Sequence, residues 1–317
     1  MTDTQPTLAN VIYHKEHLLD RAAMLAMRAM LALQPAADLG PGGRAAFDEL
    51  MAKTPSAEGV TYEAAVVGGV SGCWCRPAHT DLHTAILYLH GGAYVLGSAQ
   101  AYRHFAGQIA TRAEAAVFVA NYGLAPERPF PAAVDDADAA YRGLALAGFS
   151  SIAVAGDSAG GGLALITAAR MARAARDRSV PRPAAVCVMS PWIDLALTSD
   201  SIGARAKHDP LLTRDALEDA RRLYLGQANA KDPRASPLYG DLTDLPPVLL
   251  HVGEDEILLD DARRYAYLLA NSGPAAELHV WEGMVHVFPA NLVLLHAARE
   301  ALDLAGEFLR RKRSLAE

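Results

Sequence analysis

Ile152-Ala153-Val154-Ala155-Gly156-Asp157-Ser158-Ala159-Gly160-Gly161-Gly162-Leu163 is the stretch that decides the fold class. Its apolar start, residues 152–155, predicts a buried strand, and the residues from Gly161 onward predict a helix. Ser158 stands in the turn between them, with glycines where a side chain would collide. A serine in such a strained turn projects its hydroxyl above the sheet, at a helix N-terminus that favours negative charge. Ser158 is therefore our candidate nucleophile, and the alternative is an ordinary capping serine in a glycine-rich turn.

Outward from this turn, short apolar runs alternate with helical stretches, which is typical of a sheet with helices on both faces. Five runs are apolar on both faces, as covered parallel strands must be: residues 85–89, 116–120, 152–155, 185–189 and 248–252. The other strand candidates are residues 61–67 and 72–76, an antiparallel hairpin around Gly68-Gly69, and residues 276–281. The helices are expected at residues 101–113, 131–147, 161–176, 260–271 and 291–310.

Two helical segments stand outside this alternation, residues 10–53 and about 197–228. Both are expected to fold over one end of the sheet as a cap. The predicted organisation is a cap segment at residues 1–55 and a catalytic domain at residues 56–317, with a second cap insertion near 197–228. Nothing in the composition suggests a linker between independent domains.

The composition excludes several classes of function. The 317 residues include 29 Lys and Arg against 36 Asp and Glu, a net charge of −7, so no basic footprint for nucleic acid is present. No apolar stretch reaches the roughly 18 residues of a membrane span. Residues 22–33 predict an amphipathic helix rather than a signal sequence, because Arg28 interrupts the run. A cytoplasmic protein is expected, although secretion stays an open alternative.

The three cysteines, Cys73, Cys75 and Cys187, are expected to be inert packing residues. Cys73 and Cys75 lie two residues apart on a predicted strand, a spacing that hinders a disulfide bond between them. No metal site is expected from these thiols.

A glycine pair follows the strand at residues 85–89, in His90-Gly91-Gly92-Ala93. Acyl transfer places negative charge on a carbonyl oxygen, so its site needs backbone N–H groups aimed at that atom. The predicted donors are the amides of Gly91, Gly92 and Ala159, and His90 is expected to brace the loop. The alternative is a plain turn after a strand, since Gly-Gly marks loops of many kinds.

A serine nucleophile needs a histidine base, which needs a carboxylate to fix its tautomer. Four histidines lie beyond residue 208, and only His286 falls in a loop after a predicted strand. The strand at residues 248–252 ends in acidic residues, of which Asp255 and Glu256 are both left open as the acid. Glu254, Asp260 and Asp261 are weaker candidates, and their ordinary role is to occupy the first turn of the next helix, which favours acids.

Together these motifs resemble the bacterial hormone-sensitive-lipase-like carboxylesterases over about residues 61–310. The resemblance rests on the acid and His286 segments and on residues 90–98, 122–127, 130–136, 156–161 and 190–194. It implies an α/β-hydrolase fold: a mostly parallel eight-stranded sheet flanked by helices, with a helical cap. It also implies a serine esterase that needs no metal or other cofactor, a small-molecule ester as substrate, and a homodimer that forms through the sheet edge near the last strand or through its adjoining helix.

The family's acid stands in a D-x-L-x-D pattern, which Glu256-Ile257-Leu258-Leu259-Asp260 fits with glutamate first. The resemblance therefore favours Glu256, and Asp255 is the alternative. Two departures stand out. Ala93 replaces the third glycine of the family's loop, which narrows the space near the acyl group. Gly123 replaces an arginine, so no ion pair from that position to an acid such as Asp136 can form.

Four residues are candidates for binding the substrate: Ala93, Trp192, Met24 and Met27. The methionines recur on one helix and could line an adaptable pocket, although packing that helix is the more ordinary role. Trp192 could equally be a core aromatic residue. The expected substrates are small to medium apolar esters, with lactones or amides as variants. A non-catalytic receptor on the same fold is the rival hypothesis, and the presence of His286 argues against it.

Overall fold

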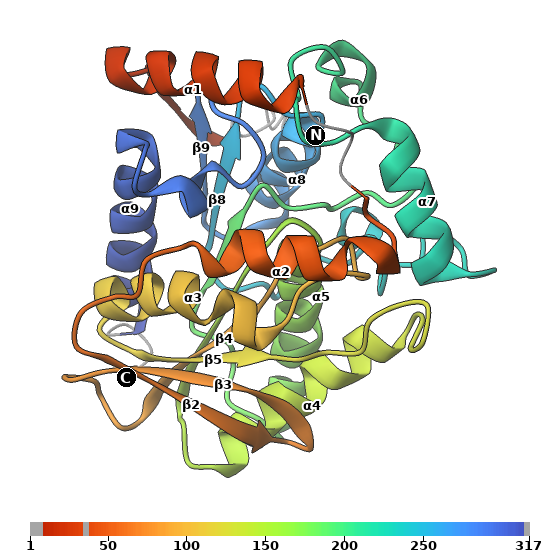
Figure 1. Cartoon of the computed structure of the whole chain (residues 1–317). Helices are drawn as coiled ribbons and strands as arrows, with labels where there is room; N and C mark the ends of the chain where they lie inside the picture. The colour runs from red at the N-terminus through yellow and green to blue at the C-terminus, as the bar shows by residue number, and fades with distance from the viewer. Residues whose placement is uncertain (1–8, 34–37, 314–317) are drawn as a thin grey trace, which may run out of the picture.

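The computed structural model describes residues 9–33 and 38–313, which form one nine-stranded sheet in the order β1-β9-β8-β7-β6-β4-β5-β3-β2 (Figure 1). The strands are β1 Asn10–His14, β2 Val60–Val67, β3 Val70–Pro77, β4 Thr84–Leu89, β5 Ala116–Ala120, β6 Ser151–Asp157, β7 Val186–Met189, β8 Val248–Gly253 and β9 Ala276–Trp281. From β1 to β5 all neighbours in the sheet are parallel, and β3 joins β5 antiparallel. The eight predicted strands are all present, close to their predicted bounds.

The ninth strand, β1, corrects the prediction of an eight-stranded sheet and of a helical segment beginning at residue 10. It pairs in parallel with β9 from Asn10 opposite Glu277 to His14 opposite Trp281. The run Val11-Ile12-Tyr13 favours a strand because β-branched and aromatic residues fit a pleated surface. The strand therefore occupies the β9 edge through which a homodimer was expected to form, and the homodimer itself stays a prediction.

The hairpin of β2 and β3 turns at Gly68 and Gly69, as the sequence predicts. Both glycines have positive φ, of 60° and 81°, between the paired residues Val67 and Val70. A two-residue turn of this kind requires two left-handed residues, which is why glycine occupies both positions.

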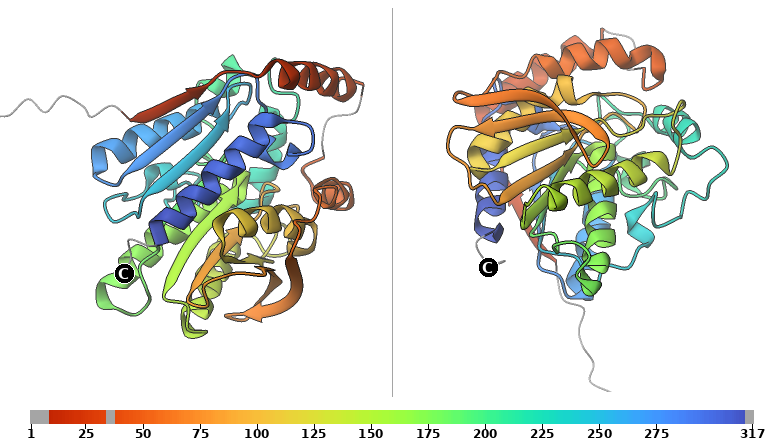
Figure 2. Two further views of the ribbon diagram at one scale, coloured as in Figure 1. Left: turned by 90° about the vertical axis from the view of Figure 1, so that its left-hand side faces the viewer. Right: turned by 90° about the horizontal axis from the view of Figure 1, so that it is seen from below.

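Helices cover both faces of the sheet (Figure 2). The helices are α1 Leu18–Leu31, α2 Arg44–Ala52, α3 Ala99–Ala113, α4 Ala132–Leu146, α5 Ser158–Ala174, α6 Ser201–Ala204, α7 Arg214–Leu225, α8 Leu259–Ser272 and α9 His296–Arg313. One face packs mainly against α3 and α9, and the other packs against α4, α5 and α8. These two hydrophobic layers hold the sheet rigid, so the loops at its carboxyl ends have fixed positions.

The predicted cap residues reach those loops. Arg28 of α1 contacts Asp255 after β8, and Arg44 at the start of α2 donates to the carbonyl oxygen of Val95 after β4. The predicted insertion at residues 197–228 holds α6 and α7. Residues 1–8 and 34–37 of the predicted cap segment lie outside the described residues, and the division into cap and catalytic domain stays a prediction.

Within the two described ranges, no helix is both long and apolar enough to cross a membrane. The cytoplasmic location stays a prediction.

Candidate active site

The nucleophile turn has the geometry that its sequence predicts. Ser158 begins α5 directly after β6 and has a φ of +51°, a left-handed conformation that costs energy for a residue with a side chain. A Cβ atom at Gly156 would collide with the carbonyl oxygens of Gly160 and Leu89. The glycines thus let α5 start against the end of β4, which leaves Ser158 partly exposed above the sheet.

Three predicted side chains meet at the carboxyl ends of the strands. His286 Nε2 lies 2.9 Å from Ser158 Oγ, and His286 Nδ1 lies 2.8 Å from Glu256 Oε2. Glu256 is fully buried, and His286 is 9% exposed. This is the arrangement of a nucleophile, a base and an orienting acid.

Asp255, the alternative acid, points to different partners. Its Oδ2 accepts a hydrogen bond of 2.7 Å from Arg28 Nη2 in α1. Arg205 Nη1 and His208 Nδ1, both in the predicted cap insertion, lie 3.6 Å and 3.8 Å from Asp255 Oδ1. Asp255 therefore connects the loop after β8 to both cap segments, whereas its neighbour Glu256 contacts His286.

The second oxygen of Glu256 is held by groups that the sequence analysis did not identify. Gly253 N donates to Glu256 Oε1 at 2.6 Å, and Ser190 Oγ donates to the same atom at 2.8 Å. The Ser190 hydroxyl also accepts from Val287 N at 2.9 Å. Ser190 thus joins the acid to the segment that carries His286. Its position directly after β7 was the available signal, because strand ends are where a sheet presents functional groups.

Asp209 is a second buried carboxylate near the histidine. Its Oδ2 accepts from Ile257 N, the residue after Glu256, and its Oδ1 accepts from Leu211 N and Leu212 N, each at 2.9 Å. The side chain therefore fastens the acid loop to the predicted cap insertion. Burial raises the pKa of Asp209.

The electrostatics of the site favour a protonated form of His286 more than burial alone would allow. Burial lowers the pKa of a histidine, but the hydrogen bond and charge of Glu256 oppose this effect, with the charges of Asp209 and Asp157. The balance raises the pKa of His286 above its usual value. The site is thus built to stabilise an imidazolium ion.

In the loop after β4, one of the predicted amide donors already has an acceptor within the protein. Gly91 N donates to Asp157 Oδ1 at 3.0 Å, so this amide is already engaged. Asp157 also accepts from Tyr88 Oη at 2.7 Å and Tyr102 Oη at 2.9 Å. Burial raises the pKa of Asp157 to about 6. A Cβ atom at Gly91 would collide with Asp157, so this glycine serves close packing against the nucleophile turn.

The next two residues offer their amides instead. Within the described ranges, the N–H groups of Gly92, Ala93 and Ala159 have no protein acceptor. Gly92 and Ala93 have φ values of +116° and +55°, and the Gly92 carbonyl accepts from Val95 N and Leu96 N. Ala93, which replaces the third glycine of the family's loop, adopts the left-handed conformation itself, so this backbone geometry does not require glycine at position 93. Two of these three amides, those of Gly92 and Ala159, are among the predicted donors, and Ala93 was predicted only to narrow the space near the acyl group.

His90 occupies the bracing position expected of it. Its Nδ1 lies 2.8 Å from the Gly91 carbonyl oxygen, and its ring stacks on Tyr122 at a centroid distance of 4.4 Å. The Tyr122 hydroxyl donates to the His90 carbonyl at 2.6 Å. Burial lowers the pKa of His90 to about 4, so this residue stays neutral.

The candidate substrate-binding residues divide into two groups. Met24 and Trp192 are only 2% and 1% exposed and lie in hydrophobic clusters, where they pack the fold rather than line an accessible surface. Met27 is half-buried beside the Met24 cluster. Ala93 lies in the loop after β4, and its own amide is one of the three that have no protein acceptor in the described ranges.

Asp136 pairs with an arginine from a position other than 123. Arg128 Nη1 and Nη2 donate to the two oxygens of Asp136 at 2.5 Å and 3.0 Å, and Gly123 N donates to the same carboxylate at 2.7 Å. The sequence rules out an ion pair to Asp136 only from position 123, and in the structure Asp136 pairs with Arg128 instead. A side chain at position 123 would crowd the Arg128 guanidinium.

The chain is similar in sequence and in fold to known proteins. The family described as "alpha/beta hydrolase fold" matches residues 86–290. The chain is 42% identical to an acetyl-hydrolase of Streptomyces hygroscopicus over 246 residues, covering 77% of this chain and 81% of that protein. It is 34% identical to an esterase of Acinetobacter venetianus over 268 residues, covering 84% and 87%. A solved esterase from the bacterial hormone-sensitive lipase family superposes with a TM-score of 0.86 at 37% identity, covering 94% of this chain and 99% of that one.

Proposed function

This chain belongs to the α/β-hydrolase family as a carboxylesterase related to the bacterial hormone-sensitive-lipase esterases, and we propose that it cleaves small to medium apolar esters through an acyl-enzyme on Ser158. The observation that carries this proposal is the hydrogen-bonded series Ser158, His286 and Glu256. The Streptomyces relative is named an acetyl-hydrolase, which agrees with a short acyl group.

In the first step, His286 Nε2 takes the proton of Ser158 Oγ, and the oxygen attacks the ester carbonyl carbon. Glu256 holds the imidazole tautomer through Nδ1 and stabilises the imidazolium ion. The imidazolium then gives its proton to the leaving alcohol, and the acyl group stays on Ser158 Oγ. The 2.9 Å and 2.8 Å distances need no rearrangement for these transfers.

The developing negative charge falls on the carbonyl oxygen. We assign its donors as the amides of Gly92, Ala93 and Ala159, because these have no other acceptor in the described chain. Ala159 follows Ser158 in the chain, and the neighbour of Gly92, Gly91, is hydrogen-bonded to Asp157, which precedes Ser158. The Cβ atom of Ala93 narrows the site beside the acyl group, which favours small acyl chains. Water then attacks the acyl-enzyme, with His286 again as the base, and releases the acid.

The direct test is hydrolysis of chromogenic esters from acetate to dodecanoate by the parent and by Ser158→Ala. We expect the parent to prefer the short esters and the variant to lose about 10⁶-fold in kcat, the scale seen when a serine nucleophile is removed. Ser179→Ala, an exposed serine away from the site, is the matched control.

Undiminished turnover by Ser158→Ala would exclude the acyl-enzyme mechanism. A parent that prefers dodecanoate would keep the mechanism but exclude the proposed substrate range.

A further inference from the structure

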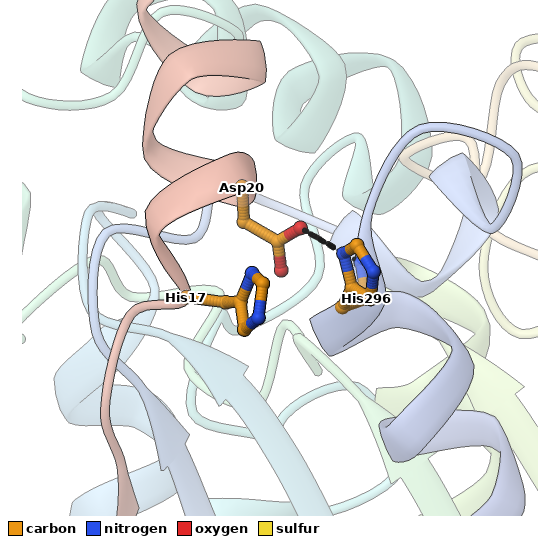
Figure 3. A group of neighbouring side chains, drawn as sticks. All are labelled: His17, Asp20 and His296. Atoms are coloured by element: carbon orange, nitrogen blue, oxygen red, sulfur yellow. Dashed lines mark hydrogen bonds and ion pairs between the residues drawn. The ribbon is translucent and has the colours of Figure 1, made fainter.

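Three potential metal ligands lie together where α1 and α9 begin, apart from the residues of the proposed triad. Figure 3 shows His17, which precedes α1, Asp20 in the first turn of α1, and His296, the first residue of α9. One ligand atom from each side chain lies within 4.8 Å of the other two. Histidine nitrogens and a carboxylate oxygen are the donors that zinc and similar divalent ions prefer.

The carboxylate of this cluster is fixed in place. Asp20 is fully buried, its Oδ1 accepts from His296 N at 2.8 Å, and its Oδ2 accepts from Ala297 N at 2.8 Å. His296 Nδ1 also lies 3.1 Å from Asp20 Oδ1. A carboxylate oriented by backbone amides resembles the supported ligands of known metal sites.

The two imidazoles each have a nitrogen to offer. His17 Nδ1 accepts a long hydrogen bond of 3.3 Å from Leu19 N, and His296 Nδ1 faces Asp20. Across the described part of the chain, neither Nε2 atom has a hydrogen-bond partner. His17 is exposed and the His296 side chain is 40% exposed, so an ion from solvent can reach both.

The rings are not yet arranged around a common point. The two rings stack at a centroid distance of 4.4 Å and an interplanar angle of 27°. Because a nitrogen lone pair lies in the plane of its ring, the lone pairs of two stacked rings do not point at one common atom. Ligand atoms around a tetrahedral zinc ion lie about 3.3 Å apart, which follows from zinc–nitrogen distances of about 2.0 Å. Binding of an ion therefore requires a rotation of the His17 ring about its side-chain torsions, and the exposure of His17 leaves room for it.

We propose that His17, Asp20 and His296 bind one divalent zinc-like ion, with water as the remaining ligand, and that the ion fastens the start of α1 to the start of α9. Calcium and magnesium fit less well, since both favour all-oxygen sites. The site is separate from the proposed esterase chemistry, which needs no metal. Its effect is on the cap, because α1 also carries Arg28, the partner of Asp255 beside Glu256.

Calorimetric titration of tag-free, chelator-treated protein with ZnCl₂ tests the proposal. We expect one equivalent of zinc to bind with a dissociation constant of about 1 μM. The unfolding temperature should also rise, since a ligand that binds the native state stabilises it. Cobalt(II) should give the strong visible absorption of a tetrahedral site.

Two variants remove single ligands. His17→Asn keeps an N-cap acceptor for α1, and His296→Asn keeps the backbone N–H that Asp20 accepts. Each should weaken zinc binding by more than about a hundredfold, the upper range for loss of a supporting residue alone. The matched controls are His79→Asn and His83→Asn, two exposed histidines elsewhere, which should bind zinc as the parent does.

Zinc binding of equal strength in the parent and His17→Asn would overturn the proposal, since it would place the ion elsewhere, such as on His286 and Glu256. Binding weaker than about 1 mM in the parent would also overturn it. Because neither readout depends on ester hydrolysis, these results do not bear on the proposed function.

Discussion

Two loops at the carboxyl ends of parallel strands frame the proposed site, and they are supported differently. The loop at His90–Ala93, after β4, is held from within the sheet domain, by Asp157 on β6 and by Tyr122. The loop at Gly253–Glu256, after β8, is also held by Arg28 and Asp209 from the predicted cap segments. On the oxyanion side the cap contact, Arg44 to the Val95 carbonyl oxygen, lies just beyond this loop, whereas on the acid side Arg28 contacts a residue of the loop itself. Cap movement would therefore disturb the orientation of His286 before it disturbed the amide donors.

The largest effect within this comparison should come from the acid itself. Glu256→Gln removes the charge that fixes the His286 tautomer, so we expect kcat to fall by about 10⁴-fold. Asp255→Asn removes a partly exposed charge that faces Arg28, Arg205 and His208. Exposed ion pairs are worth about 1 kcal/mol or less each, so we expect kcat to fall by about fivefold or less.

Steady-state kinetics of both variants on one short ester give the answer, with thermal unfolding to show that each is folded. A loss in Asp255→Asn as large as in Glu256→Gln would assign the acid role to the loop as a whole rather than to Glu256.

An intermediate effect is expected on the oxyanion side. Asp157→Asn keeps one acceptor oxygen but loses the charge that holds Gly91 N and two tyrosine hydroxyls. We expect kcat to fall by about tenfold to a hundredfold, less than the loss of a whole oxyanion donor, with KM nearly unchanged. Tyr102→Phe, which removes one of these hydrogen bonds, is the graded comparison. A rise in KM at constant kcat would show that Asp157 shapes substrate binding instead.

The sequence predicts the scaffold side of the site better than the cap side. Local sequence patterns predict β4, the turn at Ser158 and the loop with His286. These patterns are the spacing of apolar residues and the placement of glycines, which involve only neighbours in the chain. The hydrogen bond that engages the Gly91 amide has no local signal, because its acceptor, Asp157, lies 66 residues away. Asp157 directly precedes Ser158, so an acid beside the nucleophile was the available signal.

Long-range contacts explain the remaining differences. The predicted last helix began at residue 291, whereas α9 begins at His296, where the distant Asp20 accepts from its first two amides. A helix start fixed by a residue more than 270 positions earlier has no local signal. The pairing of β1 with β9 is similar, since only the folded sheet presents the edge that it joins.

The smallest expected effect is specific to the cap side. It is a shift in the pH dependence of kcat/KM in Asp209→Asn. The pKa of His286 is raised by Glu256 and then by Asp209 and Asp157. Turnover needs neutral His286, so activity should rise as pH increases through this raised value, above about 6.5. Asp209→Asn removes one of the charges that favour the imidazolium ion, which lowers the pKa of His286. The acidic limb of kcat/KM should therefore move to lower pH.

The profile of Asp209→Asn should be measured beside that of Asp157→Asn and of Asp219→Asn, an exposed acid on α7 whose side chain is 69% exposed. We expect the largest shift for Asp209, a smaller one for Asp157 and none for Asp219, because an exposed charge is screened by water. Asp209→Asn also weakens the contact with Ile257 N, so kcat at the plateau should fall by a few-fold, about 1 kcal/mol. A lower plateau with an unmoved acidic limb would mean that Asp209 only holds the loop and does not act on His286 through its charge.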